Sequence, residues 1–349
     1  MLTGVIAFSV ALLASLTLVV PVRQLALRVG MVDHPGPRKV HLTPIPLLGG
    51  LAIYCGVVLA ILVSIDGQAR AQVVGILAGA TLVAAVGILD DRGLLHHQIK
   101  LFVGMPVAGL ILLASGIRAQ AFSAVLPGQG GQWADAALTI LWVVGITASF
   151  SILDHMDGLC AGVAAVASLF FAIFASLSGQ VLVSTLAAAV MGAAVGFLRW
   201  NFNPAKIFMG DGGAMFLGFL MATLGLKLRP AGLSPANSWM IPLLILGVPI
   251  FDTTLVSISR SRRGLLPFAT PGKDHTAHRL ANLGLGQRRA VLALYVLGSA
   301  FGLLALLASR LEVRHSFALA GLTALAALLA VGLLERAPYE RQEPRRKAA

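Results

Sequence analysis

The 349-residue chain is 58% hydrophobic and only 11% charged, and its mean hydropathy is +0.89. A water-soluble domain of this length would not expose so apolar a surface, so the composition excludes that class and indicates a multi-span membrane protein. A formal net charge of +12 would suggest a nucleic-acid partner in a soluble protein. We expect no such partner here, because membrane topology accounts for the basic residues.

Eleven apolar runs are long enough to cross a bilayer, and each predicts a helix. The first run lacks a basic start and has full spanning length, so we expect it to be retained and not cleaved. The sequence thus predicts an all-α integral membrane protein, with one polytopic domain over residues 1–335 and a basic cytoplasmic tail over 336–349. The runs cover residues 2–22, 47–65, 73–89, 100–117, 136–153, 161–178, 180–198, 213–228, 238–258, 290–308 and 316–334.

Basic residues divide unequally between the two sides of this predicted bundle. Alternate threading places 20 of the 26 Lys and Arg residues on one side and six on the other. The positive-inside rule makes the richer side cytoplasmic, with the N-terminus outside and the C-terminus inside. The same threading brings seven aspartates to the cytoplasmic ends of helices. Carboxylates at a membrane edge favour a shared polar site, because each is costly there without a wet cavity, a metal or a partner.

The first cytoplasmic loop, residues 33–50, is rich in proline and contains a basic pair, Arg38 and Lys39. The prolines exclude a regular helix and indicate a stiff connection, and the basic pair suits a phosphate. Anionic lipid headgroups are the alternative partner for a basic cluster beside a membrane. The Gly49–Gly50 pair permits close backbone approach where the next helix starts.

Two adjacent carboxylates, Asp90 and Asp91, end the third apolar run, and Lys100 follows in the next. Neighbouring residues at a helix end point about a hundred degrees apart. We therefore expect Asp90 and Asp91 to serve different partners and not to chelate one ion together. The alternative is a solvated pair that only ends the helix.

A short loop without basic residues contains Asp154 and Asp157, three positions apart. On a helical turn the two carboxylates would share a face and could reach a common cation or substrate. Interfacial carboxylates without a role remain the alternative, although two acids without counter-charge are costly at a membrane edge.

A polar, glycine-rich stretch runs from Asn201 to Gly218 between two apolar runs, with Asp211 between Gly210 and Gly212. Glycines on both sides let a phosphate or a metal approach the Asp211 backbone and carboxylate closely. The alternative is that Asp211 only caps a helix that begins at Gly213.

The last cytoplasmic loop, residues 259–289, contains His275 and His278, followed by Arg279. This grouping suits an oxyanion or a diphosphate better than zinc, because no cysteine or third histidine lies within the loop. A solvated basic loop is the alternative. Asp252, late in the preceding run, is expected to be a supporting residue paired with Arg260 or Lys273.

Together, these five segments resemble the polyprenyl-phosphate N-acetylhexosamine-1-phosphate transferase family, in order and in topology, from Asp33 to Leu280. Its members include the phospho-MurNAc-pentapeptide translocase and the GlcNAc-1-phosphate transferases that initiate surface polysaccharides. The resemblance implies transfer of a sugar-1-phosphate from a UDP-N-acetylhexosamine to undecaprenyl phosphate, with release of UMP. It also implies a multi-pass enzyme of the bacterial cytoplasmic membrane that requires Mg²⁺, for which Mn²⁺ is an alternative. The oligomeric state is not fixed, and a homodimer is allowed.

The resemblance also implies roles for particular residues. The position that matches Asp211 binds magnesium in the family, and the one that matches Asp157 is also placed at the metal. The pair that matches Asp90 and Asp91 lies at the lipid phosphate and the reacting centre. His275 and His278 are expected to be catalytic and to contact the diphosphate or the sugar. Substrate contacts are also expected from the remaining matched or basic positions, with Phe208 on uracil, Asn201 on the nucleotide, and the diphosphate or sugar near Lys100, Asp154, Arg279, Arg38 and Lys39.

One departure from the family concerns the sugar. The translocase branch carries adjacent histidines in the last loop, and many GlcNAc-transferring members show His-x-His-His. Here the run is His275-Thr-Ala-His278-Arg-Leu. We therefore expect a polysaccharide-initiating enzyme that uses UDP-GlcNAc, with the peptidoglycan reaction as the alternative.

Two other classes of protein fit the composition. An ion-coupled transporter would spread its acids through the membrane depth, as in folds with inverted repeats, whereas here they gather on one side. A membrane phosphatase acting on the same lipid would need no nucleotide.

Overall fold

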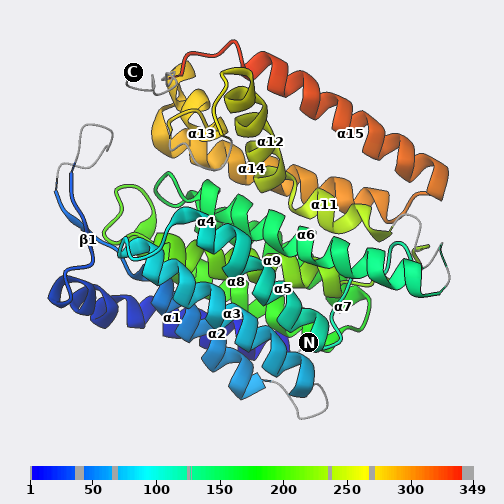
Figure 1. The fold of residues 1–349 in the computed structure, drawn as a ribbon, viewed down its shortest axis with the longest axis horizontal. Coiled ribbons are helices and arrows are strands. Elements are labelled where there is room, and N and C mark those ends of the chain that lie inside the picture. Colours follow the sequence, from blue (N-terminus) through cyan, green and yellow to red (C-terminus); the bar gives the residue numbers. More distant parts are fainter. Residues whose placement is uncertain are drawn as a thin grey trace.

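The computed structural model describes residues 2–35, 43–64, 70–123, 126, 128–234, 238–266 and 272–339. Within these ranges the chain is a helical bundle with one pair of two-residue antiparallel strands (Figure 1). The elements are α1 (Leu2–Arg28), β1 (Val32–Asp33), β2 (Ile45–Pro46), α2 (Gly49–Ser64), α3 (Arg70–Asp91), α4 (His97–Ile99), the π-helical η2 (Lys100–Gly104), α5 (Met105–Ala114), α6 (Gln129–Leu153), α7 (Leu159–Leu177), α8 (Val181–Asn201), α9 (Gly210–Lys227), α11 (Met240–Ile245), α12 (Gly247–Arg262), α13 (Thr276–Leu280), the π-helical η3 (Ala281–Leu285), α14 (Gly286–Ala308) and α15 (Val313–Leu334).

The helices confirm the predicted all-α membrane class. Helical structure lies on each of the eleven predicted runs. Seven helices of the described chain are long and apolar enough to cross a membrane, and the stretches 49–64 and 100–114 are shorter apolar helices. In lipid a helix satisfies its own backbone hydrogen bonds, which is why apolar runs of this length become helices. The count of eleven spans and the orientation of the termini stay predictions.

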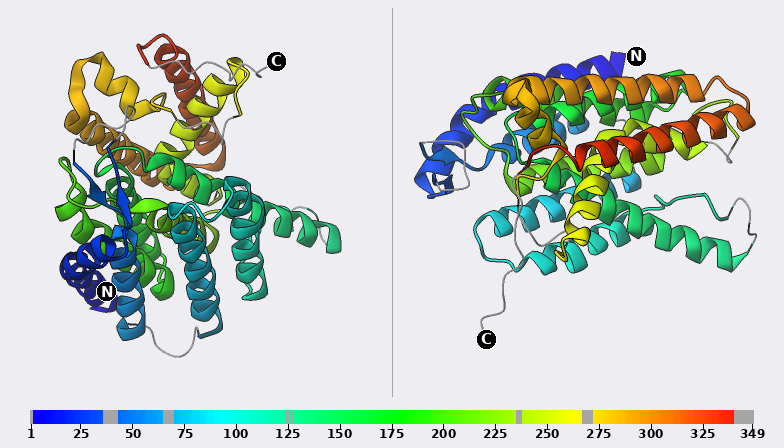
Figure 2. Two further views of the ribbon diagram at one scale, coloured as in Figure 1. Left: turned by 60° about the vertical axis from the view of Figure 1, so that its left-hand side comes forward. Right: turned by 90° about the horizontal axis from the view of Figure 1, so that it is seen from above.

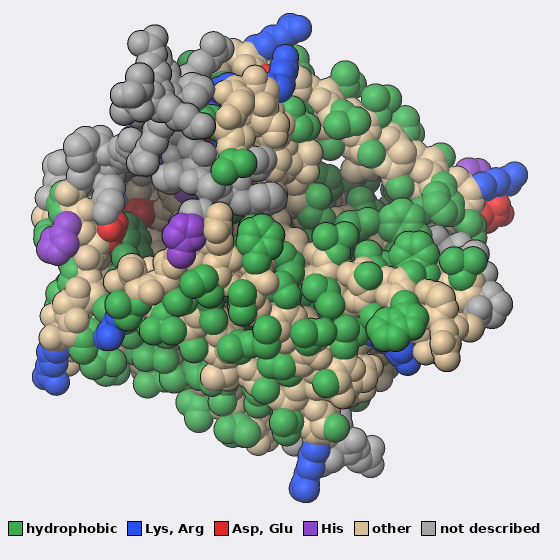
Figure 3. All heavy atoms as spheres, viewed as in Figure 1, with side chains coloured by type: hydrophobic (Ala, Val, Ile, Leu, Met, Phe, Trp, Pro, Cys, Tyr) green, Lys and Arg blue, Asp and Glu red, His purple; other side chains and the backbone are tan. Residues whose placement is uncertain are grey.

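Hydrophobic side chains cover much of the outer surface (Figure 3), whereas charged and histidine side chains lie mainly toward its edges. Helix α15 shows the outward character most clearly, since only Ser316 and Val331 of this helix are buried. Such a surface fits a bilayer, where apolar side chains face lipid.

Helix α9 is the central helix of the bundle. It packs against α2, α3, α6, α7, α8 and α11 within the bundle, which Figure 2 shows from two further sides. Every residue from Gly212 to Leu226 is buried. On the outer side of this arrangement α1 packs against α2 and α8. Because α9 begins at Gly210, its first turn carries Asp211 into contact with the ends of several helices.

Glycines allow the close packing at the start of α9. A Cβ atom on Gly50 would lie 2.3 Å from the Cα of Gly213, and one on Gly87 would lie 2.5 Å from the Gly212 nitrogen. Gly210 itself has a φ of +73°, a conformation that favours glycine. These contacts bring α2 and α3 against the first turn of α9 and confirm the predicted close approach at Gly49–Gly50.

Candidate active site

The two adjacent carboxylates at the end of α3 have different partners, as predicted. Asp90 Oδ2 accepts a hydrogen bond from Lys100 Nζ at 2.7 Å. Asp91 instead accepts from the backbone amides of α9, with 2.9 Å between its Oδ1 and the Asp211 nitrogen and 3.2 Å between its Oδ2 and the Gly212 nitrogen. Asp91 therefore caps α9, and the proposed cap by Asp211 itself is wrong.

Asp211 is the point at which three helices meet. Lys100 Nζ, from η2, donates to Asp211 Oδ2 as well as to Asp90. Ser151, near the end of α6, donates from Oγ to Asp211 Oδ1 at 2.7 Å. The three charged side chains are between 16% and 22% exposed, so the group is reachable from outside the bundle. We call Asp90, Asp91, Lys100, Ser151 and Asp211 the carboxylate cluster.

Asp154 follows α6 directly and lies beside this cluster. Within the described chain its carboxylate has neither a hydrogen bond nor an ion pair. Burial, followed by the charges of Asp211, Asp91 and Asp157, raises the pKa of Asp154 to about 8. Several buried carboxylates that repel one another in this way, with one lacking any partner, fit a divalent cation that prefers oxygen ligands.

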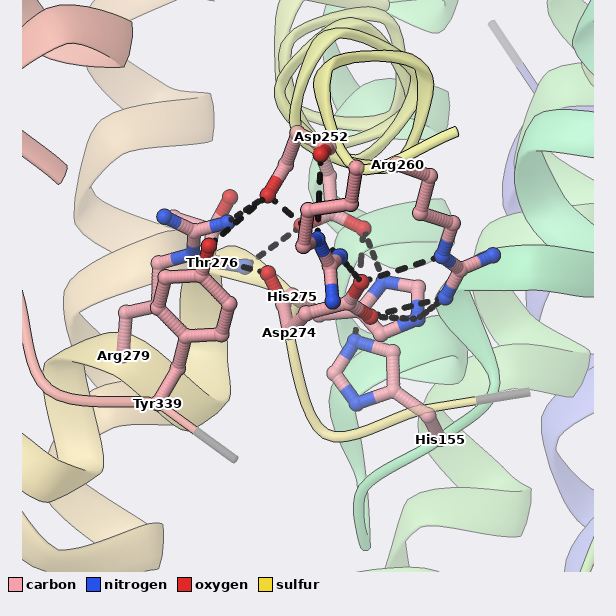
Figure 4. A network of polar contacts seen from close by, with 10 residues as sticks. His155, Asp252, Arg260, Asp274, His275, Thr276, Arg279 and Tyr339 are labelled. Atoms are coloured by element: carbon pink, nitrogen blue, oxygen red, sulfur yellow. Dashed lines mark hydrogen bonds and ion pairs between the residues drawn. The ribbon is translucent and has the colours of Figure 1, made fainter. Parts of the chain in front are cut away.

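A second polar cluster lies around His275 (Figure 4). Its Nδ1 is 2.8 Å from Asp252 Oδ2, and the other carboxylate oxygen of Asp252 accepts from the Thr276 amide at 2.7 Å. Asp252 is 1% exposed and His275 is 4% exposed. Asp252 thus pairs with His275, and the expected pairing with Arg260 or Lys273 is wrong. A buried carboxylate on Nδ1 fixes the orientation of the imidazole ring.

His155 joins this cluster and was not singled out from the sequence. Its ring lies 4.0 Å from that of His275, at 28°, and 4.8 Å from that of His278. Burial, and then the charge of His275, holds the pKa of His155 well below its usual value. Its position directly after Asp154 was the available signal. We call His155, Asp252, His275 and His278 the histidine cluster.

Among the described residues, His155, Asp252 and His275 place their ligand atoms within 4.8 Å of one another. A shared metal ion does not fit this geometry well. Ring nitrogens bind metals within the ring plane, and the planes of His155 and His275 are nearly parallel and stacked. Arg260 also places Nη2 only 3.3 Å from His275 Nε2, where a second cation would be repelled.

Comparison with known proteins shows the family to which a chain with these two clusters belongs. The model of glycosyl transferase family 4 matches residues 73–229. A probable undecaprenyl-phosphate N-acetylglucosaminyl 1-phosphate transferase of Bacillus subtilis is 38% identical over 88% of this chain and 85% of that protein. The chain belongs to this family. A decaprenyl-phosphate N-acetylglucosaminephosphotransferase of Mycolicibacterium smegmatis is 31% identical, over 79% of the chain and 74% of that protein. An undecaprenyl-phosphate alpha-N-acetylglucosaminyl 1-phosphate transferase of Yersinia pestis is 28% identical, over 90% and 87%.

The family model ends at residue 229, before the histidine loop. In the structure this loop is fixed by the buried ion pairs of Asp274. Asp274 is fully buried and receives hydrogen bonds from Arg260 Nη2 at 2.8 Å and Arg263 Nη2 at 2.6 Å. Burial opposes ionisation, but the hydrogen bonds and charge of Arg260, with further help from His275 and Arg263, keep the pKa of Asp274 below its ordinary value. Asp274 directly precedes His275, so these contacts hold the histidine loop against the end of α12.

The backbone amide of Arg279 donates to His275 O, but its side chain has its partners outside the two clusters. It is 0% exposed, donates to Asp274 O, Ser259 Oγ and Leu334 O, and pairs with Glu335. Its guanidinium also lies 4.0 Å from the centre of the Tyr339 ring. These contacts join α13 to the end of α15, and a contact of Arg279 with substrate stays a prediction.

Asn201 and Asp157 hold two loops together. Asn201 is 3% exposed, accepts from the Gly158 amide through Oδ1 and donates from Nδ2 to Ile207 O, both at 3.0 Å. Asp157 Oδ2 accepts from Asn203 Nδ2 at 3.0 Å and from the Ala205 amide at 2.9 Å. The structure thus shows both side chains fixing the loops that follow α6 and α8. Their roles toward nucleotide and metal stay predictions.

The remaining substrate contacts predicted from the sequence are those of Phe208 and of Arg38 and Lys39 in the first cytoplasmic loop. The backbone of Phe208 bonds to both sides of the β2–α2 junction, donating to Pro46 O and accepting from the Gly49 amide, each at 2.9 Å. Phe208 therefore lies three residues before Asp211 and beside the start of α2. Stacking on uracil stays a prediction. Arg38 and Lys39 lie outside the described residues.

Proposed function

We propose that this protein transfers N-acetylhexosamine-1-phosphate from a UDP-sugar to undecaprenyl phosphate, forming undecaprenyl-diphospho-sugar and UMP. The sugar is GlcNAc, and the product starts a cell-surface polysaccharide. The names of the relatives support the polyprenyl-phosphate acceptor and the GlcNAc-1-phosphate group. The observation that carries the proposal is that Asp154, beside the carboxylate cluster, is directly followed in the chain by His155 of the histidine cluster. The two clusters therefore lie next to each other at one end of the bundle.

The carboxylate cluster is suited to phosphoryl transfer. Asp211 and Asp157 would hold Mg²⁺, as expected from the sequence, and the unpaired Asp154 would be a further ligand. The ion would supply charge neutralisation to the diphosphate. Lys100 adds a cation that is directed by Asp90 and Asp211. Phosphoryl transfer relies mainly on such positioning and electrostatic stabilisation, because charge on the transferred group must be balanced in the transition state.

The lipid phosphate is already a good nucleophile in this scheme. A phosphate monoester has its second pKa near 6, so it is largely dianionic at cytoplasmic pH and needs little general-base help. One of its oxygens forms the new bond to the β-phosphorus while the bond from that phosphorus to UMP breaks. Asp90 acts as a base or positioning group, and no covalent intermediate on the enzyme is required.

The carboxylates lie where a lipid-borne phosphate can arrive. A cavity of about 380 Å³ is bordered by Asp91 and Arg92 and otherwise by mostly apolar residues of the α1–β1 connection, Leu47 and Leu94. Asp91 is the last residue of α3, one of the seven candidate spanning helices. A cavity that combines apolar side chains with the cation of Arg92 suits the junction of a lipid tail and its phosphate.

The direct test uses purified protein, undecaprenyl phosphate, Mg²⁺ and a panel of UDP-sugars, with UMP as the measured product. We expect UMP with UDP-GlcNAc and none with UDP-MurNAc-pentapeptide. Asp211→Asn should remove turnover while the protein stays monodisperse in detergent, because the amide keeps the shape but not the charge. Comparable use of the pentapeptide substrate would assign the peptidoglycan reaction, and release of inorganic phosphate without UMP would assign a phosphatase.

A further inference from the structure

His155 belongs to the histidine cluster and has no role in the chemistry proposed above. Both of its ring nitrogens are buried, and neither has a hydrogen-bond partner in the described chain. The nearest carboxylate oxygen, Asp252 Oδ2, is 4.0 Å from Nε2, which is beyond hydrogen-bond distance. Buried polar atoms in proteins are nearly always paired, so two unpaired nitrogens on one ring call for a ligand or an ordered water.

The ring is held in a defined place. The ring stacks on His275 at 4.0 Å and lies 4.8 Å from His278. Asp252 in turn fixes His275 through its Nδ1 (Figure 4). The His155 side chain is still 13% exposed, so part of it reaches the surface of the site. Stacking on two neighbours restrains the ring without using its two nitrogens, which are buried and have no partner among the described residues.

The chemistry of the ring indicates what it recognises. A neutral imidazole offers one N–H donor and one acceptor nitrogen. Phosphate oxygens only accept, and they are better matched by the cations nearby, Lys100 in the carboxylate cluster and Arg260 beside His275. A hydroxyl or an acetamido group both donates and accepts, so it can pair with either ring nitrogen, whichever of the two carries the proton.

The position of His155 agrees with such a ligand. It directly follows Asp154, whose Cα is about 3.8 Å away in any trans peptide. In a UDP-sugar the sugar is joined to the β-phosphate, so a diphosphate bound through a metal at Asp154 would bring the sugar within reach of the next residue. We infer that His155 reads a hydroxyl or acetamido group of the donor sugar and thereby sets which UDP-sugar is used. This inference rests on the proposed function.

The test compares His155→Phe with the unaltered enzyme on UDP-GlcNAc, UDP-GalNAc and UDP-glucose. Phenylalanine keeps an aromatic ring against His275 and His278 but removes both nitrogens. We expect kcat/KM for UDP-GlcNAc to fall about tenfold or more, as for a lost buried hydrogen bond. The preference for UDP-GlcNAc over the least favoured sugar should shrink by the same factor. Inhibition by UMP should be unchanged, because UMP has no sugar for His155 to contact.

Each outcome decides one question. An unchanged preference among the three donors in His155→Phe would overturn the inference and leave an ordered water as the partner. Weakened UMP inhibition together with an unchanged preference would show a structural role and overturn it as well. If His155→Phe does not fold, His155→Asn serves instead, with a changed donor preference in support and an unchanged one against. Absence of UMP from every donor with the unaltered enzyme would instead contradict the proposed function.

Discussion

Asp90 and Asp91 are neighbours in sequence, yet one binds a side-chain ammonium and the other binds the first amides of a helix 120 residues away. Their variants should therefore fail differently. Asp90→Asn should lower kcat by about 10²-fold with little change in thermal stability, because it weakens the hold on Lys100. Asp91→Asn should destabilise the protein by about 0.5–2 kcal/mol, because a helix cap is weakened.

Turnover and the melting temperature in detergent, measured on both variants, check this pair. The assignment would be contradicted if Asp90→Asn unfolded first while Asp91→Asn melted like the unaltered protein.

Ser151 offers a test of how Asp211 is positioned. Its hydroxyl donates to Asp211 Oδ1, whereas Ser149, on the same helix, donates to the Gly145 carbonyl. Ser151→Ala should raise the Mg²⁺ concentration needed for half-maximal activity about tenfold or more, because the ionised Asp211 loses a hydrogen bond of about 1.5–3 kcal/mol. Ser149→Ala is the matched control and should leave the Mg²⁺ requirement unchanged. Equal Mg²⁺ curves for the two variants would remove Ser151 from the site.

Asp154 predicts a coupling between Mg²⁺ and pH. Its pKa of about 8 in the metal-free fold lies above the ordinary 3.8, so the folded state holds a proton that the unfolded chain has lost. That contribution to stability is present at low pH and is lost as pH rises through about 8. Since Mg²⁺ needs the ionised carboxylate, its affinity should rise up to about tenfold per pH unit below pH 8 and level off above.

Calorimetry in buffers of different ionisation enthalpy measures the proton released when Mg²⁺ binds. Asp154→Asn should abolish most of that release. A Mg²⁺ affinity that stayed constant between pH 6 and pH 8 would exclude Asp154 from the ion.

Asp274 predicts a stability effect that is separate from catalysis. Asp274→Asn would leave Arg260 without its buried ion pair, and breaking such a pair is expected to destabilise the protein by about 3–5 kcal/mol. Because the pKa of Asp274 is lowered in the fold, its contribution is present at neutral pH and disappears as pH falls through that lowered value. Melting curves at pH 7 check the expected loss. A melting temperature within a degree of the unaltered protein would contradict it.

Direct attack by the lipid phosphate predicts a ternary complex of enzyme, donor and lipid. Enzyme mixed with UDP-GlcNAc and Mg²⁺ alone should release no stoichiometric UMP. Rapid-quench measurements on lipid-free protein test this. A burst of UMP equal to the enzyme concentration, absent in Asp90→Asn, would establish a double displacement with Asp90 as the nucleophile.

The sequence by itself determined the helices and the side of the bundle that holds the acids. Apolar runs of spanning length become helices because lipid offers no partner for backbone amides and carbonyls, so this result is local to each run. The sequence also predicted that Asp90 and Asp91 have different partners, because neighbouring residues at a helix end point about a hundred degrees apart.

The partners of those side chains were decided only by the tertiary structure. Asp91 meets the amides of α9, Ser151 meets Asp211, and His155 stacks on His275, and each pair joins segments 60 or more residues apart. Local sequence predicts which residues end a helix, but which helix ends meet depends on glycine contacts such as Gly87 against Gly212 and on the packing around α9. For the same reason Asn201 and Arg279, expected at the substrate, were found buried in contacts between distant segments.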